Sequence, residues 1–328
     1  MDIASNIRPT PPARFRNLAY PAAPGAPVAP ETPVIRRRFR GASVSLYEWQ
    51  CGGHGSAHPA EEWAEAHEVV VARRGAFQWE IAGTRVLADP GTVTFFHPAE
   101  SYRVRHPLPG GDAGSVFGLP PSGVIALAEE HEPAAADRGR ARFPTSHAPL
   151  DGRAYLLHRL AMDAVSDPAT TALEVEERAL AFVREAVAQG FRRRGAVRRA
   201  GPAMRGRLAS EYAARVMEVV AARYREPLTL AEVAGTVGAS PFHLSRLVTA
   251  ATGVPIYRMV LRRRLRDALE LLLETRETIS RIALAVGFAS HSHLTDAFRR
   301  EFGVPPRAVR RSGREAKGVV AGLRAPGR

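Results

Sequence analysis

Apolar residues in the last third of the chain recur at helical spacing and follow one short pattern twice. Each copy closes in the tripeptide Gly-Val-Pro, at 253–255 and at 303–305. A repeat of this kind is one supersecondary unit used twice, here a helix, a tight glycine turn and a second helix. The sequence therefore predicts two helix-turn-helix units. The equivalent apolar positions are Leu230 and Ile279, Val233 and Ile282, Val237 and Val286, Leu244 and Leu294, and Val248 and Phe298.

Polar residues mark where the helices of the first unit begin. Thr229 and Glu232 have the spacing of a capping box. Ser240 stands directly before a proline, which suits the start of the next helix. Between the units, 255–274 is expected to form one continuous helix, and about 19 residues span roughly 28 Å. The second helices of the two units are thus expected about one DNA turn apart, on the same face of the domain.

Those second helices separate into an apolar and a polar face. In 241–251, Leu244 and Val248 lie on the inward face, whereas Phe242 and Arg246 lie on the outward face with small polar residues. A face with small polar groups and one arginine suits the major groove of DNA.

Hydrophobicity alternates with a period of two between residues 36 and 118. Short strands separated by glycine-containing turns predict a small all-β barrel or jelly roll over 35–120. The fold class expected for the chain is therefore α+β. The strand-like runs are 43–49, 68–71, 77–81 and 92–96.

Helical spacing returns between 153 and 190, with a break near Pro168 that predicts two helices. Residues 120–150 have the composition of a loop. The region 121–190 either packs on the barrel or forms a homodimer through its second helix, and both alternatives stay open.

The spacing of Glu68 and Gly75, followed by Asp89-Pro90-Gly91 and a strand into His97, resembles the cupin barrel. Metal-binding cupins place a histidine pair shortly before the glutamate and another histidine later. Here those positions carry 63–65 (Trp-Ala-Glu) and Tyr102, so no metal and no cofactor is predicted. Five histidines are interpreted as ordinary surface residues instead of a metal site: His54, His58, His67, His97 and His106.

A small-molecule effector pocket in the mouth of the barrel is favoured over a metal site, because barrels of about eight strands can hold one ligand. Part of any such aromatic set normally belongs to the core. The candidate lining residues are Trp49, Phe77, Trp79, Phe95 and Tyr102.

Charge is unevenly distributed along the 328 residues. Residues 1–190 carry 19 basic and 22 acidic side chains, whereas residues 205–328 carry 22 basic and 11 acidic ones. A polyanion such as DNA would be attracted to the basic end only. Residues 191–206, with five arginines before 205, are interpreted as a basic interdomain linker.

Composition narrows the class of protein. A hydrophobic content of 45% supports packed cores, and no apolar run suits a membrane span or signal peptide. We therefore expect a cytoplasmic protein that has no membrane partner. Cys51 is the only cysteine, which excludes intrachain disulfides and a cysteine-built zinc site. The proline-rich segment 1–34 and the tail 312–328 are expected to be disordered.

Residues 207–311 resemble the DNA-binding domain of the AraC/XylS family of bacterial transcription regulators. The preceding barrel and helix pair is similar to that family's effector-binding and dimerisation region. The resemblance implies a sequence-specific regulator, usually an activator, with double-stranded DNA and RNA polymerase as partners. The motif runs from 279 to 306 and includes Ala283, Gly287, Phe288, Ser290, Ser292, Leu294, Phe298, Phe302, Gly303, Pro305 and Pro306.

The resemblance places the second helix of each unit where base contacts are made. Asp296 departs from the expected neutral or basic residue, since an acid can accept from a cytosine amino group but repels phosphate. The candidate DNA-binding residues are Ser240, Phe242, His243, Ser245, Arg246, Thr249, Arg262, Ser290, His291, Ser292, Thr295, Asp296 and Arg299.

Two other functions each require sequence features that this chain lacks. A cupin-type metal-dependent enzyme with a structural helical domain needs a His-His-Glu set, which is missing in register. No nucleotide-binding loop, nucleophile elbow or HExxH motif is present. A nonspecific architectural DNA binder would carry basic residues throughout 242–249 and 292–299, which are mostly polar. The sequence therefore favours a sequence-specific DNA-binding regulator.

Overall fold

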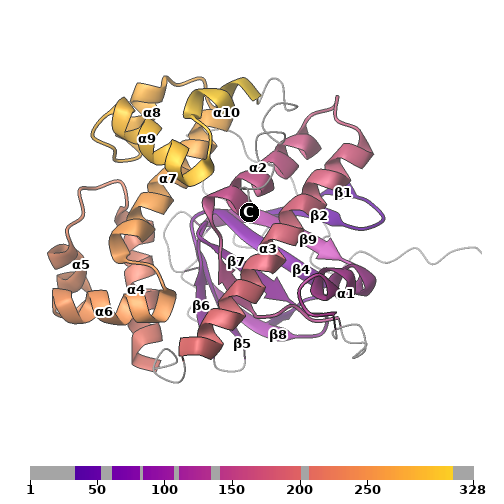
Figure 1. The fold of residues 1–328 in the computed structure, drawn as a ribbon, viewed down its shortest axis with the longest axis horizontal. Coiled ribbons are helices and arrows are strands. Elements are labelled where there is room, and N and C mark those ends of the chain that lie inside the picture. The colour runs from indigo at the N-terminus through magenta and orange to yellow at the C-terminus, as the bar shows by residue number, and fades with distance from the viewer. Residues whose placement is uncertain are drawn as a thin grey trace, which may run out of the picture.

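The structure is a computed structural model that describes residues 34–52, 61–81, 84–106, 111–133, 141–200 and 207–312. The disorder predicted for both tails falls on 1–33 and 313–328, outside the described residues. The α+β fold class is confirmed, because two β-sheets and a helix pair precede a helical domain (Figure 1). Among the described helices, none combines the length and the apolar character that crossing a bilayer requires.

Two antiparallel sheets form the N-terminal half. The six-stranded sheet has the order β1-β2-β9-β4-β7-β10, and the four-stranded sheet has the order β3-β8-β5-β6. The first contains β1 (Val34–Arg40), β2 (Ser45–Cys51), β9 (Asp112–Leu119), β4 (His67–Arg74), β7 (Thr92–Phe96) and β10 (His147–Pro149). The second contains β3 (Glu61–Trp63), β8 (Ser101–Arg105), β5 (Phe77–Ile81) and β6 (Thr84–Ala88).

Alternate residues of the central strand β4 contribute to two different cores, because side chains alternate between the faces of a strand. Val69 and Val71 belong to the core that the sheet shares with the helices. Val70 and Ala72 belong to the core between the two sheets, together with Trp79. The six-stranded sheet is therefore covered on both faces.

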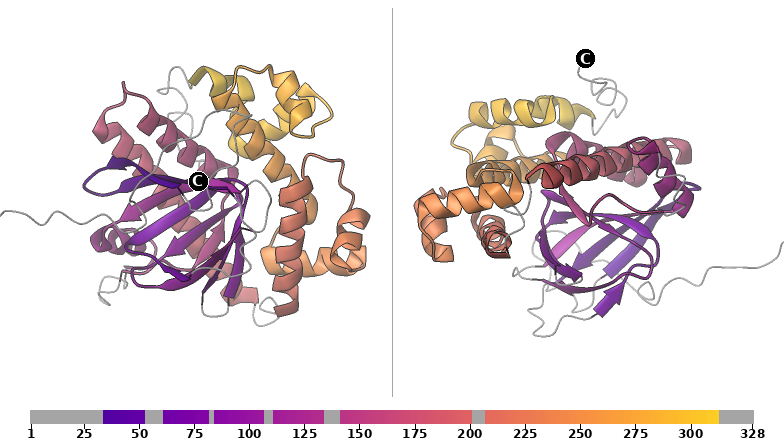
Figure 2. Two further views of the ribbon diagram at one scale, coloured as in Figure 1. Left: turned by 180° about the vertical axis from the view of Figure 1, so that it is seen from behind. Right: turned by 60° about the horizontal axis from the view of Figure 1, so that its bottom comes forward.

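Helices α1 (Pro121–Glu129), α2 (Gly152–Ser166) and α3 (Ala172–Ala200) lie N-terminal to the helical domain (Figure 2). The predicted break near Pro168 is confirmed. The apolar residues of α2 and α3 are buried in the core shared with the six-stranded sheet, so the helix pair packs on the barrel. The loop predicted over 120–150 is partly wrong, because α1 and β10 lie in it. Helix α1 has a short buried stripe formed by Val124, Leu127 and Ala128. The helix begins with Pro-Ser-Gly, a sequence typical of a loop, so the sequence did not predict it.

The basic linker predicted over 191–206 is also wrong up to residue 200. Helix α3 continues through its arginines, and Phe191 packs against the core. Arg193 Nη2 lies 2.8 Å from His147 Nε2, and Arg194 Nη2 lies 2.9 Å from Glu132 Oε2. These arginines anchor the last turns of α3 to the rest of the domain, which their charge alone did not indicate. Residues 201–206 lie outside the described part.

The helical domain contains two helix-turn-helix units joined by one helix. In the first unit, the Thr229 and Glu232 capping box is present at the start of α5. The helix predicted between the units is α7, whose 19 residues span about 28 Å. The helices are α4 (Arg207–Arg223), α5 (Leu230–Val237), α6 (Pro241–Thr252), α7 (Ile256–Glu274), α8 (Ile279–Ala285), α9 (His291–Phe302) and α10 (Pro306–Ser312).

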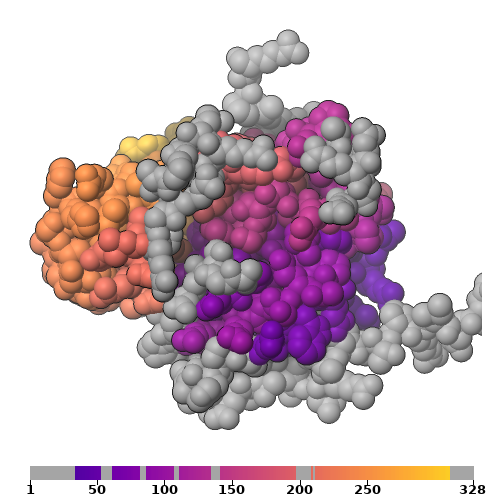
Figure 3. All heavy atoms as spheres, turned by 90° about the horizontal axis from the view of Figure 1, so that it is seen from below, coloured from indigo at the N-terminus to yellow at the C-terminus, as the bar shows by residue number. Residues whose placement is uncertain are grey.

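The two units differ in what they pack against. The first unit has a core of its own, formed by α4, α5 and α6 with the start of α7. The apolar residues of the second unit, including Phe298 and Phe302, belong to the same core as α2, α3 and the six-stranded sheet. Consistent with this, α9 contacts α2. The second unit is therefore fixed to the N-terminal half, whereas the first unit protrudes from the molecule (Figure 3).

Candidate nucleic-acid interface

Helix α6 presents a mixed polar and aromatic face to solvent. Ser240 caps its first turn by accepting a hydrogen bond from the His243 backbone N–H at 3.4 Å. Leu244 and Val248 are fully buried, so the opposite face points outward. Phe242 has 81% of its surface exposed at the start of this outer face.

Five candidate residues of the first unit lie at or near this outer face. Arg246 is exposed, whereas Ser245 and Thr249 are half-buried at its edge. The His243 ring is half-buried and packs edge-to-face against Tyr212 of α4, with ring centroids 6.2 Å apart. His243 is therefore held as a packing residue, while Phe242 and Arg246 are free to reach a groove.

Helix α9 repeats this arrangement in the second unit. Ser290 accepts from the His293 backbone N–H at 3.1 Å, and Leu294 and Phe298 are fully buried. The Thr295 side chain is half-buried, and its Oγ1 has no hydrogen-bond partner among the described residues. The exposed candidates on this helix are His291, Ser292, Asp296 and Arg299.

Three comparisons with known proteins bear on this domain. Residues 233–312 match the family model described as a helix-turn-helix domain. The multiple antibiotic resistance protein MarA of Escherichia coli is 30% identical over 95 residues, which cover 29% of this chain and 75% of MarA. The chain belongs to the AraC/XylS family.

Other AraC-family relatives match over the same third of the chain. The transcriptional regulator GlxA of Rhizobium meliloti is 35% identical over 96 residues, or 29% of this chain and 30% of GlxA. A solved AraC-type regulator structure from Chromobacterium violaceum is 30% identical and covers 33% of this chain and 96% of its own, with a TM-score of 0.31. The matched segment thus spans less than a third of the length of GlxA.

In this AraC-family chain, the two units are joined by contacts of the C-terminal end of α4 with α7. Arg264 Nε donates to the Tyr224 carbonyl at 2.6 Å, and the Tyr224 hydroxyl donates to Asp267 Oδ2 at 2.6 Å. The Arg225 carbonyl also approaches Gly287 of the second unit, where a Cβ would lie 2.6 Å from its oxygen. The angle between the units is therefore set by packing and not by a flexible joint.

The arginines of α7 are not a free basic surface. Arg262, a candidate DNA contact, is half-buried and its Nε lies 3.4 Å from Glu301 Oε1. Arg263 and Arg266 are buried, with 7% and 3% of their surface exposed. The charge of this helix stabilises the joints between units and domains, and base contact by Arg262 stays a prediction.

A buried polar network, which the sequence did not indicate, joins α7 to α2. The Tyr155 hydroxyl donates to Glu270 Oε1 at 2.8 Å, and Arg159 Nε lies 3.0 Å from the same oxygen. Arg266 donates to the Leu150 carbonyl and its guanidinium lies 5.4 Å from the Tyr155 ring centroid. In the sequence, the only feature related to this network is the spacing of Arg266 and Glu270, which stand four residues apart beside the apolar stripe of α7.

The aromatic residues proposed to line an effector pocket lie in different places. Phe77, Trp79 and Tyr102 are buried in the core between the sheets, and Phe95 is buried in the core under the helices. Only Trp49 of this set lines the cavity of about 500 Å³ that opens beside β1 and β2. Its indole N–H donates to Asp112 Oδ1 at 2.8 Å.

Five histidines were predicted to be surface residues, and the three of them that the structure describes, His67, His97 and His106, are buried or half-buried. His67 is buried, and its Nδ1 lies 3.2 Å from Nδ1 of His97, whose pKa is lowered to about 4 by burial and by Arg142. Burial acts to lower the pKa of His106. The hydrogen bond between His106 and Asp112, at 2.5 Å, has the larger effect, and the pKa of His106 is raised to about 10. His54 and His58 lie outside the described residues. Among the described residues, no group of three or more His, Cys, Asp or Glu side chains is placed to hold a metal ion.

Proposed function

We propose that the chain is a sequence-specific DNA-binding transcription regulator that acts as an activator. One observation carries this proposal: two helices, α6 and α9, begin at serine caps and present polar outer faces at the two ends of α7. An α-helix fits the major groove, and half-sites one helical turn apart suit helices held about 34 Å apart. A single chain then occupies two successive major grooves.

Different side chains on the two helices support unequal roles. Arg246 and Phe242 on α6 offer a bidentate donor for guanine and an apolar contact for a thymine methyl group. Helix α9 offers smaller polar groups and the acidic Asp296, whose charge opposes phosphate contact. The first unit is thus expected to contribute most of the base discrimination.

The N-terminal barrel is proposed to sense a small molecule, and RNA polymerase and a second copy of the chain are proposed as further partners. A ligand shifts an equilibrium only when it binds two arrangements with different affinity. The shared core of α2, α3 and the second unit provides a physical connection between the barrel and the DNA-binding domain.

Selection of bound fragments from random duplex DNA with the full chain tests the proposal. The expected result is a recovered site with two constrained blocks whose centres lie about 10–10.5 base pairs apart. A reporter promoter carrying that site should show higher expression when the chain is present. Recovery of random sequences after repeated selection would exclude sequence-specific binding.

A further inference from the structure

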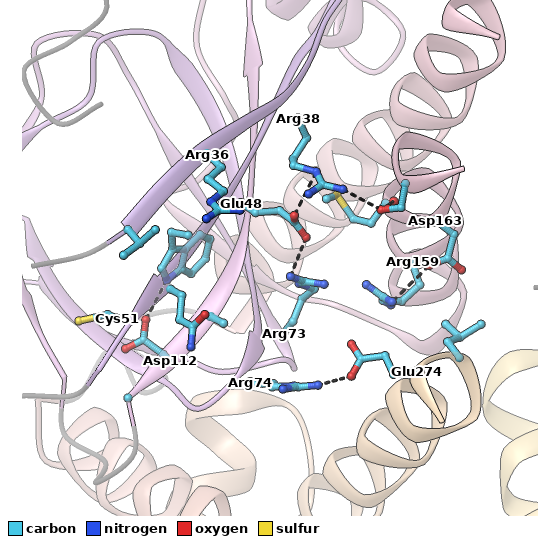
Figure 4. A pocket seen from close by; sticks show the side chains of 18 residues that line it. Arg36, Arg38, Glu48, Cys51, Arg73, Arg74, Asp112, Arg159, Asp163 and Glu274 are labelled. Atoms are coloured by element: carbon cyan, nitrogen blue, oxygen red, sulfur yellow. Dashed lines mark hydrogen bonds and ion pairs between the residues drawn. The ribbon is translucent and has the colours of Figure 1, made fainter. Parts of the chain in front are cut away.

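A cavity of about 500 Å³ lies where the N-terminal sheets, α2 and the end of α7 meet (Figure 4). Its walls include residues from β1, β2, β4, β9 and α2, together with Leu273 and Glu274 of α7. The volume falls within the usual range for a site that encloses a small organic molecule. One cavity is thus lined by both the barrel half and the DNA-binding half of the chain.

Part of this cavity lies on the helix-facing side of the six-stranded sheet, and Trp49, which packs against the core between the sheets, also lines it. Glu48 and Arg73 line it, and they lie two residues beyond Leu46 and Val71 on β2 and β4. Residues two apart on a strand share a face, and Leu46 and Val71 face the helices. The space between the sheets, by contrast, is filled by packed side chains such as Trp79.

The charged lining consists of arginines and carboxylates: Arg36, Arg38, Arg73, Arg74 and Arg159 with Glu48, Asp112, Asp163 and Glu274. Glu48 is shared by two of the arginines, with Arg73 Nη2 at 2.7 Å and Arg38 Nε at 3.3 Å. The Arg73 side chain is only 16% exposed, and its Nε is buried with no hydrogen-bond partner among the described residues. Glu48 therefore serves two partly buried cations, and Arg73 Nε is left as an open donor. Across the whole lining, five arginines face four carboxylates, an excess of one positive charge.

Ion pairs at the rim connect this site to α7. Arg74, at the end of β4, pairs with Glu274 in the last turn of α7. Arg159 of α2 lines the cavity and pairs with Glu270, one helical turn earlier on α7, at 3.0 Å. Figure 4 shows Arg38, Arg73 and Arg159 directed toward the same space. An anion that enters this space meets the side chains that hold α7 against the barrel half.

We propose that this cavity binds a small organic anion, whose charged group interacts with Arg73 and Arg38 and competes with Glu274 for Arg74. Planar guanidinium forks match carboxylate and phosphate oxygens. The apolar lining by Val34, Met162 and Leu273 accommodates a hydrocarbon portion. Binding loosens the end of α7 and changes how the second unit is docked, a regulatory step that rests on the proposed DNA-binding function.

Ligand binding is tested without DNA by thermal unfolding of the full chain with octanoate, phenyl phosphate and inorganic phosphate. Octanamide serves as the neutral match for octanoate. The two organic anions should raise Tm by about 2 °C at ten times their dissociation constant. The larger of the two shifts identifies carboxylate or phosphate as the headgroup. Equal shifts with octanamide, or no shift with either organic anion, would overturn the proposal.

Variants assign the effect to the cavity. Arg73→Gln and, independently, Arg38→Gln should weaken binding by about tenfold or more, because each removes a charged donor. Arg184→Gln is the matched control, since Arg184 is 67% exposed on α3 and pairs with Glu130 outside the cavity. Unchanged binding in both cavity variants would contradict the site.

Coupling to DNA is measured with the selected site as probe. Octanoate or phenyl phosphate should change DNA affinity by about fivefold or more. Glu274→Gln should produce a change in the same direction without ligand and remove most of the further response. A chain that binds the anion but selects no DNA supports the anion site and contradicts the proposed regulatory function. A ligand-independent DNA affinity contradicts the coupling.

Discussion

Arg246 and Asp296 show how similar helices acquire different chemistry through single residues. Both side chains are exposed on the outer faces of α6 and α9, and on the inner faces Leu244 and Val248 correspond to Leu294 and Phe298. The first offers a planar cation to guanine, and the second carries the sign of charge that phosphate repels. The fold of the two units is therefore similar, and we propose that a few outer positions set their different contributions to recognition.

Arg246→Ala should reduce affinity for the selected site by about 1–3 kcal/mol and relax the preference at one base pair. The reason is the loss of a bidentate base contact in the major groove. Competition binding against single-base variants of the site measures both effects, with Arg184→Ala as the control variant. An equal loss on every sequence would show that Arg246 contacts phosphate instead.

Gly287→Ala should destabilise the joint between the two units. Gly287 has φ of +90°, and an added Cβ would lie 2.6 Å from the Arg225 carbonyl oxygen. Strain of this kind costs about 1–3 kcal/mol, and the relief it requires moves α4 relative to α8 and α9. Urea unfolding should show the loss of stability. Gly235→Ala on exposed α5, where a Cβ meets nothing within 4 Å, should be neutral or stabilising.

At the scale of elements, α7 has a double role. It is the rod between the two recognition helices, and it is also the element that docks on α2. Its buried residues include two arginines and one glutamate as well as the apolar stripe. A helix that is buried on most of its surface must satisfy its charges internally. The network around Glu270 pairs part of this charge and fixes the second unit to the N-terminal half, while Glu270 Oε2 and Arg266 Nε have no hydrogen-bond partner among the described residues.

Tyr155→Phe should lower the unfolding free energy by about 1–3 kcal/mol, because it removes a donor from the buried Glu270 carboxylate. Tyr257→Phe is the matched control, since Tyr257 lies on α7, the helix that carries Glu270, and is 69% exposed. That control should change stability by less than about 0.5 kcal/mol. Equal effects in urea titrations would mean that the hydroxyl of Tyr155 contributes nothing specific.

Local signals predicted the helical domain well. The capping box at Thr229, the serine cap at Ser240 and the continuous helix between the units are all confirmed. These features depend on residues three or four positions apart, so the sequence shows them directly. The predicted strand runs 43–49, 68–71, 77–81 and 92–96 correspond to β2, β4, β5 and β7, because alternation is a local pattern, whereas β6 was not among them.

The cavity and the domain interface lacked such signals. The Arg74–Glu274 pair joins residues 200 positions apart, and the Tyr155–Glu270 bond joins residues 115 apart. Residues 192–194 were predicted to belong to a linker, because runs of charged residues are typical of linkers. In the structure they continue α3, and contacts with His147 and Glu132 hold this segment in the helix. Tertiary partners decided these cases, and they are not visible in a local window.

At the scale of the whole molecule, histidines give stability a dependence on pH in both directions. Burial and the charge of Arg193 lower the pKa of His147 to about 3. The neutral form of His147 therefore stabilises the fold fully above pH 6.5, and this contribution to the unfolding free energy is lost as the pH falls toward 3. His106 acts oppositely. Its raised pKa of about 10 gives stability that is full below pH 6.5 and is lost as pH rises toward 10.

Unfolding free energy should therefore decrease on both sides of neutral pH. His106→Gln should flatten the alkaline decrease between pH 6.5 and 10, and His147→Gln should flatten the acid decrease below pH 6.5. Urea titrations at a series of pH values measure both slopes, and each variant is the control for the other. An alkaline slope that is unchanged in His106→Gln would place the responsible group elsewhere.

We propose that one chain reads two successive major grooves on one face of a duplex. Guanine N7 methylation interference on the selected site, with the full chain, tests it most directly because N7 lies in the major groove. Two clusters of interference about 10–10.5 base pairs apart are expected, and Arg246→Ala should remove the interference at one guanine of one cluster. A single cluster, or two clusters half a turn apart on opposite faces, would contradict it.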